Sequence, residues 1–157
     1  DIDIPNILLR SLVNDWMLGV YADENGDKDV FVILTTNFFQ NAFAGMLQWE
    51  SVMADDLKRY LFPSKISGVA NTSSLPRSAT STASTTNNVD PLKQYFTIRG
   101  KFEDRIVKNK DVREFRTEAG EILFLYSFID NSHLLVATKE STLAEVLTRL
   151  EKRAFIR

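Results

Sequence analysis

The chain has 157 residues, and its 19 basic and 21 acidic side chains give a net charge of −2 at pH 7. Hydrophobic residues make up 44% of it, which is enough for a buried core and too much for a disordered chain. The absence of cysteine excludes disulfide scaffolds, zinc fingers, thiol nucleophiles and iron–sulfur sites, and the near-neutral charge argues against a nucleic-acid partner.

A short helix and a two-stranded hairpin are predicted first. Leucines at helical spacing indicate a helix that ends near Asn14. Asn25-Gly26 is a strong signal for a tight hairpin turn, because both residues accept positive φ. The turn is expected to join a strand over Trp16–Tyr21 to a strand over Val30–Thr35.

A long amphipathic helix is predicted next. Its apolar residues recur at three-, four- and seven-residue steps, at Phe39, Phe43, Met46, Met53 and Leu57. Thr36 or Asn37 is expected to cap its start, and Pro63 is expected to end it by Leu61. Gly45 inside this helix predicts close packing against a neighbouring element.

The composition changes abruptly after Pro63. Ten of the 15 residues in 72–86 are Ser or Thr, and such a segment buries too little apolar surface to offset its ordering entropy. We therefore expect a flexible Ser/Thr-rich insertion at about 64–90 in a single domain that spans residues 1–157. A spacer between two domains, or a stalk glycosylated at Asn71-Thr72-Ser73, remains an alternative.

Three strands and a helix are predicted in the second half of the chain. The strands are expected over Val112–Arg116, Glu121–Phe128 and His133–Thr138. Thr142 and Glu145 have capping-box spacing and are expected to open the helix. Its apolar stripe consists of Leu143, Val146, Leu147 and Leu150.

Both halves end in a strand that leads into an amphipathic helix. Val32–Thr36 before the first helix resembles Leu134–Thr138 before the second, which would fit a duplicated strand-strand-helix unit. The predicted fold class is α+β: a mainly antiparallel sheet with two amphipathic helices on one face.

No metal or cofactor site is indicated. The alternating acids of the first hairpin begin like a calcium loop, but an EF-hand needs Gly where Lys28 stands and Glu where Leu34 stands. His133 is the only histidine, so a two-histidine metal site is excluded and a structural role at the start of a strand is expected. We expect no cofactor and assign no catalytic residue.

Three hypotheses for function stay open. Phe38, Trp49 and Val52 on the long helix would form a contact face for a protein partner or a second copy. A strip for anions would consist of Lys108, Lys110, Arg113 and Arg116. A hydrolase that acts on a surface or cell-wall polymer would have to use acids, of which the candidates are Glu50, Asp55, Asp56, Asp104 and Asp111.

Two segments carry a resemblance to known sequences. The first is Asn41–Glu50, with its Ala-Phe-Ala-Gly-Met-Leu-x-Trp-Glu run, followed by Met53–Leu57, and the second is Phe102–Arg113. Together with Leu125–Phe128 and Thr142-Leu143 they resemble an uncharacterised family of membrane-anchored bacterial proteins from the reduced-genome candidate phyla. The resemblance implies an extracytoplasmic domain of the cell envelope, anchored by a segment upstream of Asp1, and it supplies no activity to carry over. The predicted function is therefore a non-enzymatic envelope domain that binds another protein or itself.

Overall fold

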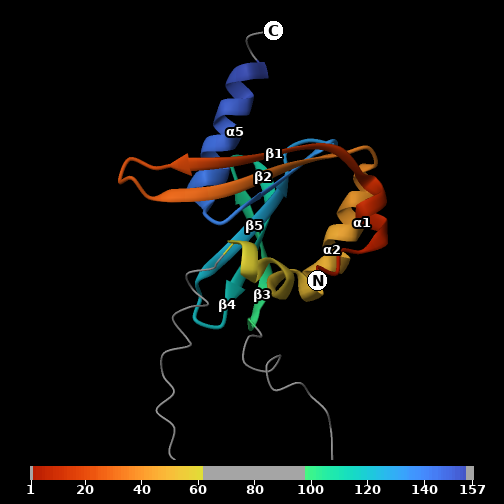
Figure 1. Cartoon of the computed structure of the whole chain (residues 1–157). Coiled ribbons are helices and arrows are strands. Elements are labelled where there is room, and N and C mark those ends of the chain that lie inside the picture. The colour runs from red at the N-terminus through yellow and green to blue at the C-terminus, as the bar shows by residue number, and fades with distance from the viewer. Residues whose placement is uncertain (1, 62–97, 155–157) are drawn as a thin grey trace, which may run out of the picture.

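A six-stranded antiparallel sheet carries helices on both of its faces (Figure 1). The computed structural model describes residues 2–61 and 98–154. In sheet order, the strands are β1 (Leu12–Ala22), β2 (Lys28–Thr36), β6 (His133–Ala137), β5 (Ile122–Phe128), β4 (Lys110–Thr117) and β3 (Gly100–Val107). The helices are α1 (Asn6–Ser11), α2 (Phe39–Leu61) and α5 (Glu140–Ala154). The predicted α+β class with a mainly antiparallel sheet is confirmed.

Each face of the sheet buries its own core. Neighbouring residues of a strand point to opposite faces, so Leu134 and Leu135 of β6 belong to different cores. The first core joins α1 and α2 to the sheet through Leu8, Met46, Met53, Phe124 and Leu134. The second core joins α5 to the sheet through Leu125, Leu135, Leu143 and Leu147. Burial of each side chain of this size contributes about 1.5–3 kcal/mol, so both helices are held firmly.

The prediction that both amphipathic helices lie on one face is wrong. Strands β2 and β6 are antiparallel neighbours, with Ile33 opposite Leu135. A twofold axis that exchanges them is perpendicular to the sheet, so a duplicated unit related by it would keep both helices on one side. Instead α2 packs on one face and α5 on the other. The order of elements along the chain is the same in the two halves, but their packing is different.

Close packing between α1 and α2 at Gly45 is confirmed. A Cβ atom at Gly45 would lie 2.6 Å from Leu8 Cβ and 2.8 Å from the Leu8 backbone nitrogen. Leu8 itself is buried. The absence of a side chain at Gly45 therefore fixes how closely the opening helix approaches the long one.

The two tight hairpins differ from the sequence prediction. In the β1–β2 turn only Gly26 has a positive φ, of 83°, and Asp23 Oδ1 accepts hydrogen bonds from the backbone N–H groups of Asn25 and Asp27. The two-residue turn with positive φ at both positions is at Lys108 (51°) and Asn109 (58°), between β3 and β4. Asp23, the first acid of the pattern that begins like a calcium loop, thus stabilises the β1–β2 turn.

Some boundaries also differ. Strand β3 has no counterpart in the prediction, because charged residues at Lys101, Glu103, Asp104 and Arg105 hide its strand pattern. Helix α5 begins at Glu140, so Thr142 is buried inside its first turn and is not the cap. The insertion predicted at 64–90 and its glycosylation tripeptide lie outside the described residues. None of the described helices has the length and apolar character needed to cross a bilayer.

Candidate functional site

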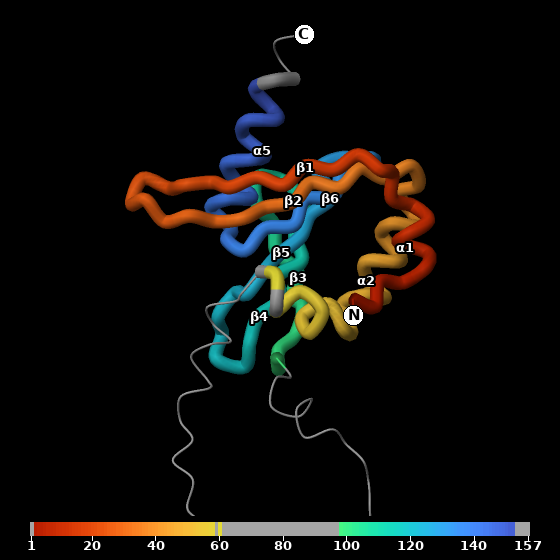
Figure 2. The backbone as a smooth tube through the Cα atoms, in the orientation of Figure 1, coloured from red at the N-terminus to blue at the C-terminus, as the bar shows by residue number. Residues whose placement is uncertain are grey.

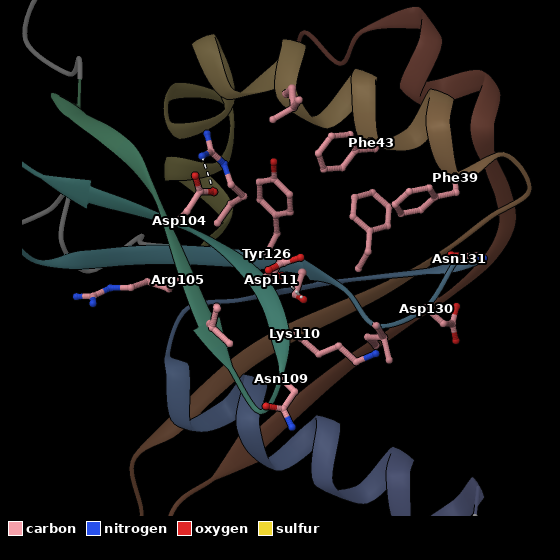
Figure 3. Close-up of a pocket in the computed structure, with 16 residues that line it drawn as sticks. Phe39, Phe43, Asp104, Arg105, Asn109, Lys110, Asp111, Tyr126, Asp130 and Asn131 are labelled. Carbon is pink, nitrogen blue, oxygen red and sulfur yellow. Dashed lines mark hydrogen bonds and ion pairs between the residues drawn. The ribbon is translucent and has the colours of Figure 1, made fainter.

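A cleft of about 1100 Å³ opens between α2 and the strands β3, β4 and β5 (Figure 3). One wall is aromatic: Phe39 and Phe43 project from α2 and meet Phe128 of β5, with the Phe39 and Phe128 ring centroids 5.0 Å apart. The opposite wall is polar and includes Asp104 and Lys110. The cleft therefore has one aromatic wall and one polar wall.

Arg113 of β4 organises the base of the cleft. Its Nε and Nη2 donate to the two carboxylate oxygens of Glu50 at 2.8 and 2.6 Å, and its Nη1 donates to Asp104 at 2.8 Å. The hydroxyl of Tyr126 donates to Glu50 Oε1 at 2.7 Å, and Figure 3 shows Tyr126 pointing toward α2. This bidentate pair ties α2 to the sheet across 63 sequence positions.

The ionisation of this network is fixed by its own contacts. Burial, followed by the hydrogen bond to Glu50, raises the pKa of Tyr126 well above its usual value, so the hydroxyl remains a donor. The hydrogen bond to Glu50 is also the main cause that raises the pKa of Arg113, and it outweighs burial. Each of these groups is therefore engaged within the protein.

The acids predicted for hydrolysis do not form a free pair. Glu50 and Asp104 both bind Arg113, and of these two acids only Asp104 lines the cleft. Asp55 pairs with Lys58 at 2.8 Å. Asp56 accepts hydrogen bonds from Trp49 Nε1 and from the backbone of Asp3, and Asp111 is exposed at the cleft wall. Four of the five candidate acids therefore each bind a neighbouring residue, and Asp111 shares the cleft wall with Asp104 and Asp130.

The contact face predicted on the long helix is wrong for Trp49. This side chain is only 6% exposed and belongs to the core, where its Nε1 bonds Asp56. Val52 is half-buried against the same core, whereas Phe38, just before α2, is 60% exposed. The three residues do not form one surface because Trp49 faces the sheet.

The predicted anion strip does not form either. Arg113 points to the α2 side, while Arg116 donates to Glu114 on the α5 side, at 2.8 Å from Nη2. Lys108 is exposed in the β3–β4 turn, and Lys110 lines the cleft. The two arginines are neutralised by buried or half-buried carboxylates, and the sheet separates them.

His133 contacts a neighbouring acid at the start of β6. Its Nδ1 lies 2.9 Å from both carboxylate oxygens of Asp130, in the turn before β6. Partial burial would raise the pKa of Asp130, but the backbone N–H of Ser132 and the His133 ring outweigh it and lower that pKa below its usual value. No cluster of three or more His, Asp or Glu side chains suited to a metal ion occurs in residues 2–61 and 98–154.

An apolar sheet edge was not anticipated from the sequence. Strand β1 is the outermost strand and pairs only with β2. Four of its large apolar side chains are at least half exposed: Trp16 (62%), Met17 (50%), Leu18 (59%) and Val20 (64%). Asp15 is the single charged residue among the 11 residues of the strand. Such an edge presents unpaired backbone groups together with apolar surface.

The β1–β2 hairpin also extends beyond the rest of the sheet (Figures 1 and 2). Strand β6 pairs with β2 only over residues 31–35, so Lys28–Val30 and the facing end of β1 have no third strand beside them. The hairpin end is therefore accessible on both faces, apart from Asp29, which is buried and accepts a hydrogen bond from Thr138.

No family model, curated protein or solved structure matches this chain. The resemblance to an envelope family therefore stays a prediction.

Proposed function

We propose that this chain is a non-catalytic protein-interaction module that binds through strand β1. The observation that supports the proposal is the unprotected edge: an 11-residue outer strand with Trp16, Met17, Leu18 and Val20 at least half exposed. Removal of apolar surface from water contributes about 25 cal/mol per Å², so a partner that covers these side chains gains binding energy.

An extended partner strand would suit this surface. An added strand would hydrogen-bond to the free backbone groups of β1, while its alternate side chains would pack beside Trp16, Leu18 and Val20. Long apolar edges promote aggregation when nothing covers them, and proteins commonly protect them with charges, proline or a covering element. Strand β1 has Asp15 near one end and no lysine or proline.

The cleft is the second candidate site, and it would serve the hydrolase alternative. Arg113 binds both Glu50 and Asp104, two of the five acids that were candidates for hydrolysis. Of the three aspartates that line the cleft, Asp104 is held by Arg113 and Asp130 contacts His133, so the hydrolase stays the alternative.

An envelope location on the extracytoplasmic side is part of the proposal. It rests only on the resemblance described for residues 41–50, 53–57, 102–113, 125–128 and 142–143. Fractionation of cells that express the full-length gene tests it: the protein should remain with the membrane pellet and be digested by protease added to intact cells. Recovery in the cytosolic fraction would contradict it.

Display of a random peptide library against the immobilised protein tests the binding function. Peptides enriched on the wild type should be extended apolar sequences, and Leu18→Lys should abolish their binding because a charge then lies in the middle of the edge. Ile106→Lys is the matched control, because Ile106 is 75% exposed on the opposite edge strand β3. Enrichment that is unaffected by Leu18→Lys, or lost equally in both variants, would contradict the proposal.

A further inference from the structure

We infer that the partner of β1 is a second copy of this chain, paired antiparallel through β1 about a twofold axis, so that two six-stranded sheets join into one. The inference rests on the proposed function, since it names the strand that covers the edge. It is argued from three properties of β1: its side-chain order, the position of its charge, and the extent of its exposed surface.

The side-chain order makes the strand complementary to itself. A twofold axis perpendicular to the sheet keeps each face, so it must pass beside a residue and not between two residues. With the axis at Leu18, Trp16 lies opposite Val20 of the second copy and Leu18 lies opposite its own equivalent. The large Trp16 thus meets a smaller side chain, and all three exposed residues on this face are paired with one another.

The opposite face fits the same register. With the axis at Leu18, Met17 lies opposite Gly19 of the second copy. Gly19 has no side chain, and the ring of Phe31 covers it so closely that a Cβ atom there would be 2.2 Å from Phe31 Cζ. Met17 would therefore pack against the ring of Phe31 in the other copy, a contact that thioethers favour.

Charge distinguishes this register from its neighbours. With the axis at Gly19, Asp15, in the irregular stretch between Leu12 and Trp16, would come near Asp23 in the turn of the second copy at both ends of the pairing, and neighbouring like charges are destabilising. With the axis at Met17, Val20 would face Asn14. The axis at Leu18 places Asp15 opposite Tyr21 and keeps the two Asp15 carboxylates far apart.

The exposed surface is of the size that a small dimer needs. The exposed parts of Val13, Trp16, Met17, Leu18 and Val20 amount to on the order of 500 Å² per copy. Backbone and flanking residues of the hairpin bring the interface toward the roughly 800 Å² per partner that is typical of stable complexes.

Sedimentation equilibrium over about 1 to 100 µM protein tests the dimer. We expect the wild type and Ile106→Lys to be dimeric at the upper concentrations, and Leu18→Lys and Val20→Lys to be monomeric, with circular dichroism showing that each variant is folded. A wild type that stays monomeric throughout, or a dimer that persists in both β1 variants, would overturn the inference.

Disulfide trapping tests the register, and the natural chain contributes no cysteine of its own. Leu18→Cys should crosslink rapidly to itself, because facing Cα atoms in an antiparallel pair are about 4.5–5.5 Å apart, within disulfide range. Trp16→Cys mixed with Val20→Cys should crosslink as a heterodimer. Ile106→Cys gives the rate of random encounter. Faster trapping of Leu18→Cys with Val20→Cys than of Leu18→Cys with itself would refute the axis at Leu18.

The two proposals fail separately. Library peptides that bind the wild type and lose binding in Leu18→Lys, together with a monomeric wild type, would leave the interaction function intact and overturn the dimer. A wild type that is monomeric, and that binds no peptide in a way that Leu18→Lys abolishes, would overturn both proposals.

Discussion

The two edges of the sheet are built in opposite ways. Strand β3 carries four charged residues in eight, and Lys101 pairs with Glu103 at 2.9 Å along it. Strand β1 carries one charged residue in 11 and exposes Trp16, Leu18 and Val20. Charges on an edge discourage further strands from adding, so β3 is closed to pairing and β1 is open.

The comparison shows that the open edge is specific to one side. Had both edges been apolar, the surface of β1 would indicate only a poorly soluble sheet. Because the same chain protects β3 with charge, the lack of such protection on β1 supports the proposal that a partner covers this surface.

The stability of the domain should depend strongly on the ion pair between Glu50 of α2 and Arg113 of β4. Arg113→Met should lower the free energy of unfolding by about 3–5 kcal/mol, because Glu50 is only 13% exposed and would remain as an unpaired charge. Urea denaturation measures the loss. The double variant Glu50→Leu/Arg113→Met should recover much of it, because no buried charge remains. A loss below about 1 kcal/mol for Arg113→Met would show that the pair does not hold α2 to the sheet.

The α1–α2 contact precedes the open edge in the chain and should be the next most sensitive point. Gly45→Ala should cost about 1–3 kcal/mol, because the new methyl group would overlap the backbone and Cβ of Leu8. Thermal unfolding compares it with Gln48→Ala, an exposed position on the same helix. If Gly45→Ala is as stable as wild type, the helices are not as close as described.

Alkaline pH should lower the free energy of unfolding through Tyr126, which lines the cleft. The pKa of Tyr126 is raised in the folded state, so its stabilising contribution is complete below the unfolded pKa of about 10 and decreases as pH rises above it. Between pH 10 and 11 the free energy of unfolding should fall by about 1 kcal/mol. Chemical denaturation at each pH, with Tyr126→Phe as the control that lacks this slope, measures it. An equal slope in the control would assign the effect to other groups.

Removal of charge from the edge strand β3 should allow further strands to pair with it. Lys101→Val/Glu103→Val should change the free energy of unfolding by less than about 0.5 kcal/mol, because the ion pair is exposed. The same variant should associate beyond the dimer, since β3 then resembles β1. Light scattering at increasing concentration detects this growth. A variant that keeps the wild-type mass would show that the charges are not what protects β3.

Much of the fold was predictable because its elements have strong local signals. The periodicity of α2 and α5, the Asn25-Gly26 turn and the apolar strands β5 and β6 all depend on nearby residues. Strand β3 was missed because an edge strand buries few of its residues, here Val107 fully and Phe102 in part. The face chosen by each helix depends on packing against distant strands, which the local pattern does not contain.

The candidate site was predictable in its residues and not in its arrangement. Glu50 and Arg113 were each singled out, for hydrolysis and for anion binding, but their pairing across 63 positions neutralises both roles. The edge was missed for another reason: an apolar strand has the same sequence whether it is buried between two strands or lies outermost.

The middle of the sheet has a consequence for how the molecule opens. Strands β5 and β6 are covered by one core above and another below, and each is flanked by strands on both sides. Their amide protons should exchange with solvent only when the whole domain unfolds, whereas those at the end of the β1–β2 hairpin should exchange through local fraying. The surface proposed to bind a second strand is thus also the part that can loosen first, without disturbing the centre.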